Sequence, residues 1–273
     1  MPTDEENVAH YYDTAIFELE LIRLSRDFPV EGAITLRWLD RLMPAAASVA
    51  EIGVGGGLYS EYLARKGCRV HLVDISARLL DAAAKRLRDA GLEQSIAGAV
   101  QESATRLDSL ATSAFDAVLL LGPLYHLCSP EARRQAVAEA ARILKPGGLL
   151  FAAGVNRLSY LRELFRDSPQ LVVERKAFHE QYLRDGNLNP QVAPPIGYAH
   201  MTTVAEFREL FAPAFTELAL VGVESFIGPW QKAISDLTPD QQAAWLDIFD
   251  CTGQTIEGLC ASDHFLYVGR RSA

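Results

Sequence analysis

Cysteine and long apolar runs are both scarce in this sequence of 273 residues. Its four cysteines form no CxxC pair and no histidine stands at zinc-finger spacing, so we expect free thiols and no metal site. No apolar run approaches the roughly 20 residues that span a bilayer. The acidic start, MPTDEENVAH, is unlike a secretory or transit peptide. These absences predict a cytoplasmic protein without a membrane partner.

Positive charge is also in short supply. The chain has 26 lysine and arginine residues against 35 aspartate and glutamate residues, which gives a formal net charge of −9. A protein that binds nucleic acid needs a positive surface to meet the phosphates, whereas the basic residues here are scattered along the chain. Nucleic acid is therefore not expected as a partner.

Several motifs of catalysis and nucleotide binding are missing as well. The absence of a GxxxxGK[ST] run argues against a nucleoside triphosphate site, and no GxSxG run provides the nucleophile of a hydrolase. The stretch HEQYL at residues 179–183 begins like a zinc-protease motif, but leucine stands where the second histidine ligand is required.

The residues that are present alternate between helix and strand patterns. In residues 5–42, apolar side chains recur at intervals of three and four residues, as in amphipathic helices. Seven strands are then expected, at SVAEIG, RVHLVDI, IAGAVQE, FDAVLLLG, LLFAAGV, TELALVGVESF and HFLYVGRR. Strands buried on both faces, with helices between them, indicate an α/β fold with a doubly wound, mostly parallel, Rossmann-like sheet.

The alternation breaks between the fifth and sixth strands. About sixty residues there mix helical pieces with the loop NLNPQVAPPIGY, and such a long insertion is typical of a lid or a substrate wall. We divide the chain into an N-terminal helical cap (1–44), a ligand-binding core (45–155), a substrate-cover insertion (156–214) and a C-terminal part (215–273) that completes the same domain. In this last part, LTPDQQAAWLDIFDCTGQTIEGL is expected to form one helix.

The stretch VAEIGVGGGLYS carries four glycines within five positions directly after the first expected strand, where open parallel sheets bind ligands. The dinucleotide fingerprint GxGxxG fits Gly53 and Gly55 but requires glycine at Leu58, and the third glycine comes one residue early, at Gly57. Asp74 closes the second strand at the roughly 20-residue spacing from which a carboxylate reaches ribose hydroxyls. This pattern suits a ligand with a ribose but no pyrophosphate. The structural alternatives are a tight turn without a ligand and, for Asp74, a solvated strand end or a helix-capping partner.

Five segments, in order across about residues 45–155, resemble the motifs of the class I S-adenosylmethionine-dependent methyltransferases. AEIGVGGG resembles the first motif of that family, HLVDIS the second, VQESATRL the third, FDAVLLLGPLYHL the fourth and ARILKPGGLLFAAG the segment after the fourth. The YYD near the start and LLLGPLYHL resemble the small-molecule branch related to ubiquinone and menaquinone biosynthesis. The resemblance implies S-adenosylmethionine as methyl donor and S-adenosylhomocysteine as product.

The resemblance assigns the methionyl end of this cofactor to residues around the first and fourth motifs. Gly53, Gly55 and Gly57 would let the backbone approach the methionyl group. Glu51 would reach the ammonium group, directly or through water, and Leu121 would offer its carbonyl to the same group.

The ribose and adenine end of the cofactor is assigned to the second and third motifs. Asp74 would accept hydrogen bonds from both ribose hydroxyls, and Ile75 would pack on the adenine. Ser103 and Ala104 would frame the adenine edge, where the family more often has an acid followed by a small residue. Glu102 stands one place early, so the sequence leaves open which of these side chains contacts adenine.

Candidate residues for the methyl acceptor come from three segments. His126, in GPLYHL, is the candidate general base; a packed or helix-capping histidine is the alternative. Tyr12 resembles an N-terminal tyrosine that closes over the sulfonium in related enzymes, and Tyr11 is equally near, although either could be a core aromatic. Tyr125 would wall the pocket. His200, in GYAHMTT, is a candidate on the substrate side, with a helix-entry role as its alternative.

The sequence therefore predicts an enzyme, a methyltransferase that transfers a methyl group to an oxygen, nitrogen or carbon of a small organic acceptor. Methyl transfer from a sulfonium is an in-line displacement that depends mainly on alignment and on an apolar, dry pocket. The alternatives are an NAD(P)-dependent oxidoreductase and a non-catalytic partner protein with the same fold. A homodimer is left open.

Overall fold

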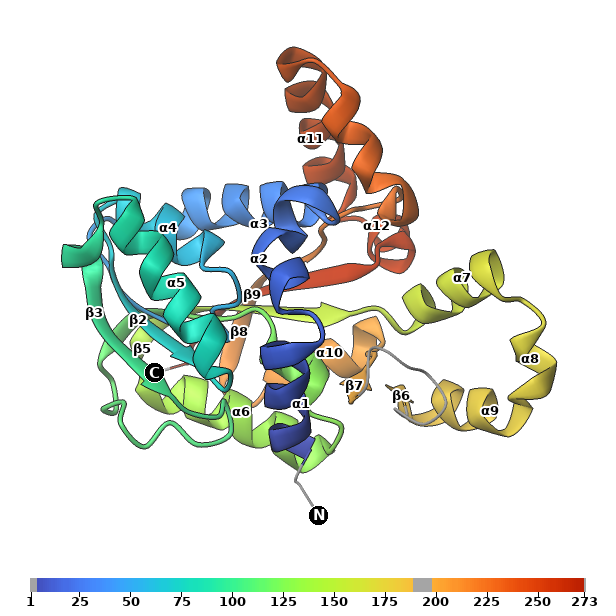
Figure 1. Ribbon diagram of the computed structural model, residues 1–273, viewed down its shortest axis with the longest axis horizontal. Helices are drawn as coiled ribbons and strands as arrows, with labels where there is room; N and C mark the ends of the chain where they lie inside the picture. Colours follow the sequence, from blue (N-terminus) through green and yellow to red (C-terminus); the bar gives the residue numbers. More distant parts are fainter. Residues whose placement is uncertain (1–3, 189–197, 273) are drawn as a thin grey trace.

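The computed structural model describes residues 4–188 and 198–272, so most of the loop NLNPQVAPPIGY lies outside the described residues. Figure 1 shows the chain with its elements labelled. The N-terminal region forms three helices, α1 (Asp4–Thr14), α2 (Phe17–Arg26) and α3 (Pro29–Leu42). The core that follows contains β1 (Ser48–Ile52), α4 (Leu58–Arg65), β2 (Arg69–Asp74), α5 (Ala77–Asp89), η1 (Glu93–Ser95), β3 (Ile96–Gln101), β4 (Phe115–Leu120), η2 (Pro123–His126), α6 (Pro130–Ile143) and β5 (Leu144–Val155).

The segment between the fifth and sixth strands of the large sheet is mostly helical. It contains α7 (Arg157–Asp167), α8 (Leu171–Glu174), α9 (Lys176–Asp185), β6 (Asn187–Leu188), β7 (Ala199–His200) and α10 (Val204–Phe211). The chain ends with β8 (Phe215–Gly222), η3 (Gly228–Asp236), α11 (Pro239–Thr252), α12 (Ile256–Ala261) and β9 (His264–Arg271). In Figure 1, α7, α8 and α9 extend away from the sheet and α11 rises above it.

The large sheet has seven strands in the order β3-β2-β1-β4-β5-β9-β8. Strands β1 to β5 pair in parallel, and β9 is antiparallel to both of its neighbours, β5 and β8. The winding reverses between β1 and β4, which is the point where open α/β sheets bind ligands. The predicted doubly wound, mostly parallel, seven-stranded sheet is confirmed.

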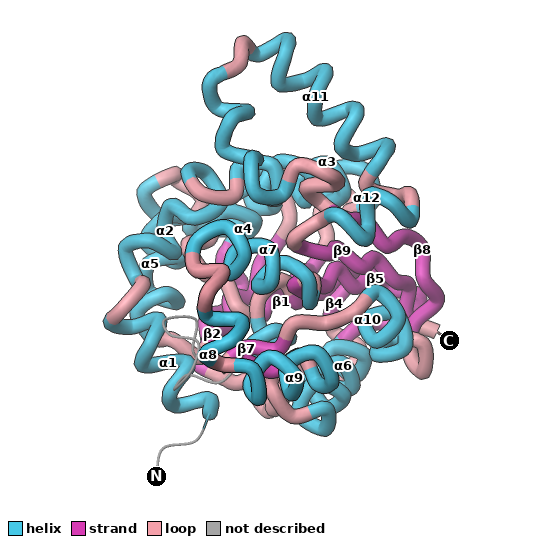
Figure 2. Tube along the Cα trace, turned by 90° about the vertical axis from the view of Figure 1, so that its right-hand side faces the viewer, coloured by secondary structure: helices cyan, strands magenta, loops and turns pink. Residues whose placement is uncertain are grey.

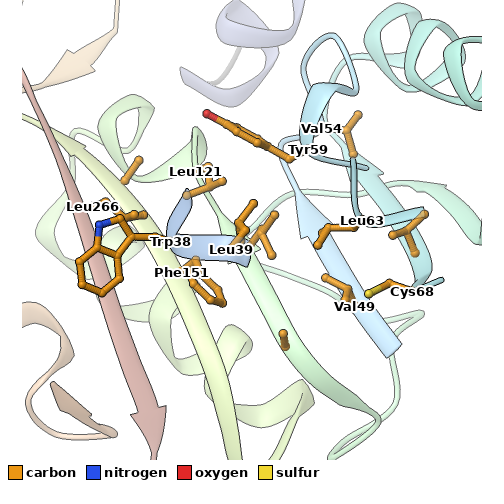
Figure 3. Packing of buried hydrophobic residues seen from close by; sticks show 14 of the residues in the cluster. Trp38, Leu39, Val49, Val54, Tyr59, Leu63, Cys68, Leu121, Phe151 and Leu266 are labelled. Carbon is orange, nitrogen blue, oxygen red and sulfur yellow. The ribbon is translucent and has the colours of Figure 1, made fainter. Parts of the chain in front are cut away.

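Two hydrophobic clusters fill the two faces of this sheet, because successive strand residues point to opposite sides. Val49, Leu119 and Phe151 belong to the cluster under α3, α4 and α5, which Figure 3 shows from close by. Their neighbours along the strands, such as Leu120 and Ala152, belong to the cluster under α6 and α10. Burial on both faces explains why these strands are continuous apolar runs in the sequence.

Helix ends follow the sequence signals in most places. Ser76 and Ser129 cap α5 and α6 through their hydroxyl oxygens, and serine is a residue type that sequence patterns favour at a helix start. The single helix expected near the C-terminus is wrong: the chain forms α11 and α12 instead, and Figure 2 shows α11 standing apart. The break has a physical cause. Gly253 accepts a hydrogen bond from the amide of Gly222 in β8, and a Cβ at Gly253 would lie 2.4 Å from the Gly222 carbonyl oxygen.

In the part of the chain that the structure describes, no helix has the length and apolar character to cross a membrane.

Candidate active site

A cavity lies at the carboxyl ends of β1, β2 and β4, where the winding of the sheet reverses. Its floor is the glycine-rich loop after β1, and one side is the turn at residues 102–104. The other side is η2, and residues of α1 and α2 lie over the loop. The cavity therefore joins the motifs of the core to the N-terminal helices.

The glycine loop has a backbone that side chains would not tolerate. Gly53, Gly55 and Gly57 have φ angles of +80°, +49° and +73°, a region that L-residues with a Cβ rarely adopt. A Cβ would also lie 2.7 Å from Pro123 Cδ at Gly53 and 2.9 Å from the Cα of Ala83 at Gly57. These glycines are required for the turn and for close packing.

The fourth glycine of the loop has a different reason. Gly56 has no positive φ angle, but a Cβ there would lie 3.0 Å from the Cα of Leu21 and 3.1 Å from its carbonyl oxygen. Helix α2 therefore packs its backbone directly on the loop. The sequence predicts an N-terminal helical cap, but it does not single out α2 as the helix that packs on this loop.

Asp74 stands at the end of β2 and holds the glycine loop from the side. Its Oδ2 accepts a hydrogen bond of 3.3 Å from the amide of Gly55, and its Oδ1 accepts one of 2.8 Å from the amide of Ser76. Burial raises the pKa of Asp74 to about 6, although amide donors at Ser76, Gly55 and Val54 oppose that shift. Asp74 is thus a buried carboxylate on the cavity wall rather than a solvated strand end.

Glu51, at the end of β1, is a second buried carboxylate on the wall of the cavity. Its Oε2 accepts a hydrogen bond from the hydroxyl of Ser60. Burial raises the pKa of Glu51 to about 8, with Ser60 acting in the opposite direction. A cation that entered the cavity would favour the ionised form.

The turn after β3 brings Ser103, Ala104 and Glu102 to the cavity, and Ile75 and Leu121 line it from neighbouring strands. The hydroxyl of Ser103 donates to Glu5 Oε1 at 2.5 Å. The Glu102 carboxylate accepts hydrogen bonds from the amide and the hydroxyl of Ser109. All the residues that the motifs assigned to the ribose and adenine end are therefore together on one wall.

His126, at the end of η2, has a partner on each ring nitrogen. Its Nδ1 lies 3.0 Å from the carbonyl oxygen of Tyr198, an acceptor that requires a proton on Nδ1. Its Nε2, 2.7 Å from the hydroxyl of Tyr12, therefore accepts from that hydroxyl. Burial lowers the pKa of His126 to about 4, so the ring is neutral at pH 7.

The three candidate tyrosines have different positions. Tyr12 and Tyr125 line the cavity, and the ring of each packs edge-on against His126. Tyr11 packs edge-on against Tyr12, with ring centroids 5.8 Å apart, and is not among the described residues that line the cavity.

His200 is not brought to this cavity. It lines a second cavity near α6 and α10, where its Nδ1 lies 2.8 Å from Asn187 Oδ1. Leu124 and Tyr125 line that cavity too. Burial lowers the pKa of His200 to about 4.

Two charged residues of α2 were missed in the sequence. Glu20 and Arg23, one helical turn apart, both line the first cavity, and their side chains are only 14% and 21% exposed. In the sequence they look like an ordinary i,i+3 surface pair within FELELIRLSR. Only the packing of α2 on the glycine loop turns them inward.

Comparison with known proteins shows what the core of the chain is similar to. Residues 50–152 match the family model described as a methyltransferase domain. The chain is 40% identical over 118 residues to a ubiquinone biosynthesis O-methyltransferase of Xanthomonas oryzae, a match that covers 43% of this chain and 46% of the relative. It is 37% identical over 127 residues to the enzyme of the same name from Xylella fastidiosa, covering 45% and 48%. The chain thus matches about half the length of these curated relatives.

Solved structures show the same fold over nearly the whole chain. A SAM-dependent methyltransferase of Thermotoga maritima, described as a possible histamine N-methyltransferase, has a TM-score of 0.60 at 22% identity, covering 96% of this chain and 98% of that one. The N-methyltransferase NodS of Bradyrhizobium japonicum, in complex with S-adenosylhomocysteine, has a TM-score of 0.57 at 17% identity, covering 99% and 100%. Residues 50–152 therefore match a methyltransferase domain, and the chain has the same fold as these solved methyltransferase structures.

Proposed function

We propose that this protein is a methyltransferase that uses S-adenosylmethionine to methylate a small organic acceptor. The observation that carries the proposal is the cavity at the reversal of the sheet, with a positive-φ glycine loop as its floor and buried carboxylates at the ends of β1 and β2. Glycines there leave room for a ligand close to the backbone, and the carboxylates suit hydroxyl and ammonium donors.

The charge of the cavity supports this cofactor over a dinucleotide. Among the described residues that line it are four carboxylates, from Glu5, Glu20, Asp74 and Glu102, against two arginines. Glu51 lines it too, and its raised pKa of about 8 keeps it mostly neutral at pH 7 until a cation binds. Arg23 is paired with Glu31 at 2.8 Å and Arg86 with Glu61 at 2.6 Å. A surplus of carboxylates attracts a ligand with a sulfonium and an ammonium group and repels a pyrophosphate. With Leu58 in place of the third glycine, this disfavours an NAD(P)-dependent oxidoreductase.

The methionyl end of the cofactor is proposed to lie over the glycine loop. Glu51 would pair with the ammonium group, and the carbonyl of Leu121 would accept from the same group. Gly53 and Gly55, which line the cavity, would leave space for the chain, whereas Gly57 lets the loop pack against Ala83 of α5.

The nucleoside end is proposed to lie between β2 and the turn after β3. Asp74 would accept from the ribose hydroxyls, Ile75 would pack on adenine, and Ser103 and Ala104 would border the adenine edge. When bound, the cofactor supplies a methyl group on a positively charged sulfur.

The residues at the acceptor side would orient the acceptor and keep water out. His126 links both proposed cover segments, since it accepts from Tyr12 of α1 and donates to the carbonyl of Tyr198 in the insertion. These two hydrogen bonds support residues 1–44 as a cap and residues 156–214 as a cover over the core at residues 45–155. Residues 215–273 would complete the sheet. Tyr125 would form part of the pocket wall, while Tyr11 and His200 are not among the described residues that line this cavity. The cytoplasmic location, the homodimer and the absence of a nucleic-acid partner stay predictions.

Binding and turnover together test the proposal. S-adenosylhomocysteine should bind at micromolar strength and raise the melting temperature, because a ligand selective for the folded state stabilises it by mass action, whereas NADH should do neither. Incubation with S-adenosylmethionine and a metabolite panel should release S-adenosylhomocysteine. A larger melting shift with NADH would contradict the cofactor assignment. Cofactor binding without turnover on any acceptor would favour the non-catalytic alternative.

A further inference from the structure

A row of alternating charges runs from the cavity to the last strand of the sheet. Glu20 Oε2 lies 3.5 Å from Arg23 Nε at the cavity end. Arg23 donates two hydrogen bonds, of 2.8 and 3.1 Å, to the carboxylate of Glu31 in α3. Glu31 Oε2 lies 3.8 Å from Nδ1 of His264 in β9, and that nitrogen donates to Glu224 Oε1 at 2.5 Å. We call these five residues the charge row.

The far end of the charge row is balanced. Burial acts to lower the pKa of His264, but Glu31 and Glu224 outweigh it and raise the value to about 9, so His264 is a cation at pH 7. The Glu224 carboxylate also accepts from the hydroxyl of Ser262 and the amide of His264. Two cations, Arg23 and His264, thus face Glu31 and Glu224.

Glu20 is the carboxylate that remains. Its contact with Arg23 is an ion pair at 3.5 Å, and Arg23 is already held in two-point contact by Glu31. Burial raises the pKa of Glu20, with Arg23 as the largest opposing influence. Keeping a mostly buried carboxylate ionised costs free energy when it shares its counter-ion with another carboxylate, and a further cation bound to it would lower that cost.

The proposed cofactor leaves no hydrogen-bond donor for Glu20, because its ammonium and hydroxyl donors are assigned other partners and its sulfonium has no hydrogen to donate. Its ammonium group is assigned to Glu51 and its ribose hydroxyls to Asp74, while Glu5 and Glu102 are engaged by hydroxyl and amide donors near the adenine wall. Glu20 lines the same cavity as Tyr12 and Tyr125, and its Oε1 borders the glycine loop, 2.9 Å from where a Cβ at Gly55 would stand. Aromatic faces beside a carboxylate are a typical setting for an ammonium group.

We propose that Glu20 binds the ammonium group of the acceptor, and hence that this protein methylates primary or secondary amines. The inference rests on the proposed methyltransferase function. A phenol would have to become an anion within a cavity rich in carboxylates, which the charges oppose. His126, the other candidate base, already has both ring nitrogens in hydrogen bonds. The family match at residues 50–152 does not include α2, so it leaves the acceptor class open.

The chemistry of the step is consistent with this role. The bound ammonium gives one proton to the Glu20 carboxylate, which leaves a lone pair on nitrogen. That pair forms the new C–N bond while the C–S bond breaks and its electron pair goes to sulfur, which becomes a neutral thioether. The product is an N-methylammonium ion, and Glu20 returns its proton to solvent when the product leaves. Glu20 would therefore be both a binding group and the general base.

A matched pair of probes tests the binding step without turnover. Benzylamine, which is cationic at pH 7, and benzyl alcohol, which has a similar shape and no charge, are titrated against the protein saturated with S-adenosylhomocysteine. Benzylamine should bind the wild type about 10 to 100 times more tightly, as expected for a hydrogen bond between charged groups. Glu20→Gln should remove this preference. The control, Glu18→Gln, changes an exposed carboxylate of the same helix and should preserve it.

Turnover identifies the atom that is methylated. Tyramine offers an amine and a phenol in one molecule, and mass spectrometry of the product places the methyl group on nitrogen if the proposal holds. No preference for benzylamine, or methylation on oxygen, would overturn the amine assignment while leaving the methyltransferase function intact. An equal loss of S-adenosylhomocysteine affinity in Glu20→Gln would assign Glu20 to the cofactor and overturn the proposal too. Failure of the wild type to bind S-adenosylhomocysteine would instead contradict the proposed function.

Discussion

The two sides of the cavity are built in different ways. The proposed cofactor side consists of a glycine-rich backbone, carboxylates at strand ends and the carbonyl of Leu121, all between residues 51 and 121 and supported by the parallel sheet. The proposed acceptor side consists of side chains brought together from distant segments, with 114 residues between Tyr12 and His126 and 72 between His126 and Tyr198. One side depends on backbone shape, and the other depends on buried polar contacts between segments.

The largest loss in the free energy of unfolding is expected from removing a buried charge of the charge row, which supports the acceptor side. Glu224 is fully buried and holds the imidazolium of His264, so Glu224→Ala leaves that cation without its nearest partner. We expect the free energy of unfolding, measured in urea, to fall by about 3–5 kcal/mol. Asp81→Ala, which removes an exposed carboxylate from α5, should change it by less than about 0.5 kcal/mol. Similar small losses in both variants would show that the charge row does not support the acceptor side.

The same row makes stability depend on pH. The pKa of His264 is raised to about 9 in the folded protein, above the value of roughly 6.5 in an unfolded chain. A raised pKa means that the stabilisation is fully present below about pH 6.5 and is lost as the pH rises through about 9. The difference in unfolding free energy between wild type and His264→Gln should therefore shrink over this range, by on the order of 3 kcal/mol. A difference that stays flat or grows with pH would contradict a cationic His264.

A smaller loss in the free energy of unfolding is expected from substitutions in the glycine loop, where the cofactor side depends on backbone shape. Gly57 and Gly91 have nearly equal φ angles, +73° and +72°, but a Cβ at Gly57 would lie 2.9 Å from the Cα of Ala83, whereas a Cβ at Gly91 would meet nothing within 4 Å. Gly91→Ala should cost about 1 kcal/mol for backbone strain alone. Gly57→Ala should cost about 2–4 kcal/mol, because crowding adds to the strain. Equal losses would mean that α5 does not press on the loop.

The comparison also explains what could be predicted from the sequence. The strand pattern, the three glycines at positive φ and Asp74 form local patterns, and the sheet brings them together by its topology alone. Gly56 and Glu20 were not singled out in the sequence, because their positions depend on α2 packing across the loop. His200 was placed with the acceptor residues from its position in the insertion, but its side chain lines a different cavity. Contacts between distant segments leave no periodic or spaced signal in one sequence.

The role of Asp74 on the cofactor side can be tested by measuring how a substitution there changes ligand affinity. Asp74→Asn keeps the size of the side chain but removes the charge that would accept from the ribose hydroxyls. We expect the affinity for S-adenosylhomocysteine to fall by about 1.5–3 kcal/mol, or 10- to 100-fold, in titration calorimetry. Glu102→Gln is the control, since Glu102 lines the same cavity while its carboxylate is held by Ser109. A larger loss in the Glu102 variant would move the main polar contact of the nucleoside to the turn after β3.

The smallest effect is expected at the hydrogen bond between Tyr12 and His126, which joins α1 to the core. Tyr12→Phe and His126→Ala should each lower turnover by less than about tenfold, with a coupling of about 0.5–1.5 kcal/mol in a double-mutant cycle. The reason is that Nε2 of His126 already accepts from Tyr12 and that burial lowers the pKa of the ring to about 4, so the imidazole positions Tyr12 rather than taking a proton. The pH–rate profile of the wild type should then show no rise near pH 6.5, and the profile of His126→Ala should have the same shape. Such a rise in the wild type alone, together with a loss of roughly 10²–10⁴-fold in turnover, would identify His126 as the general base after all, and the acceptor side would then do chemistry through η2 instead of through α2.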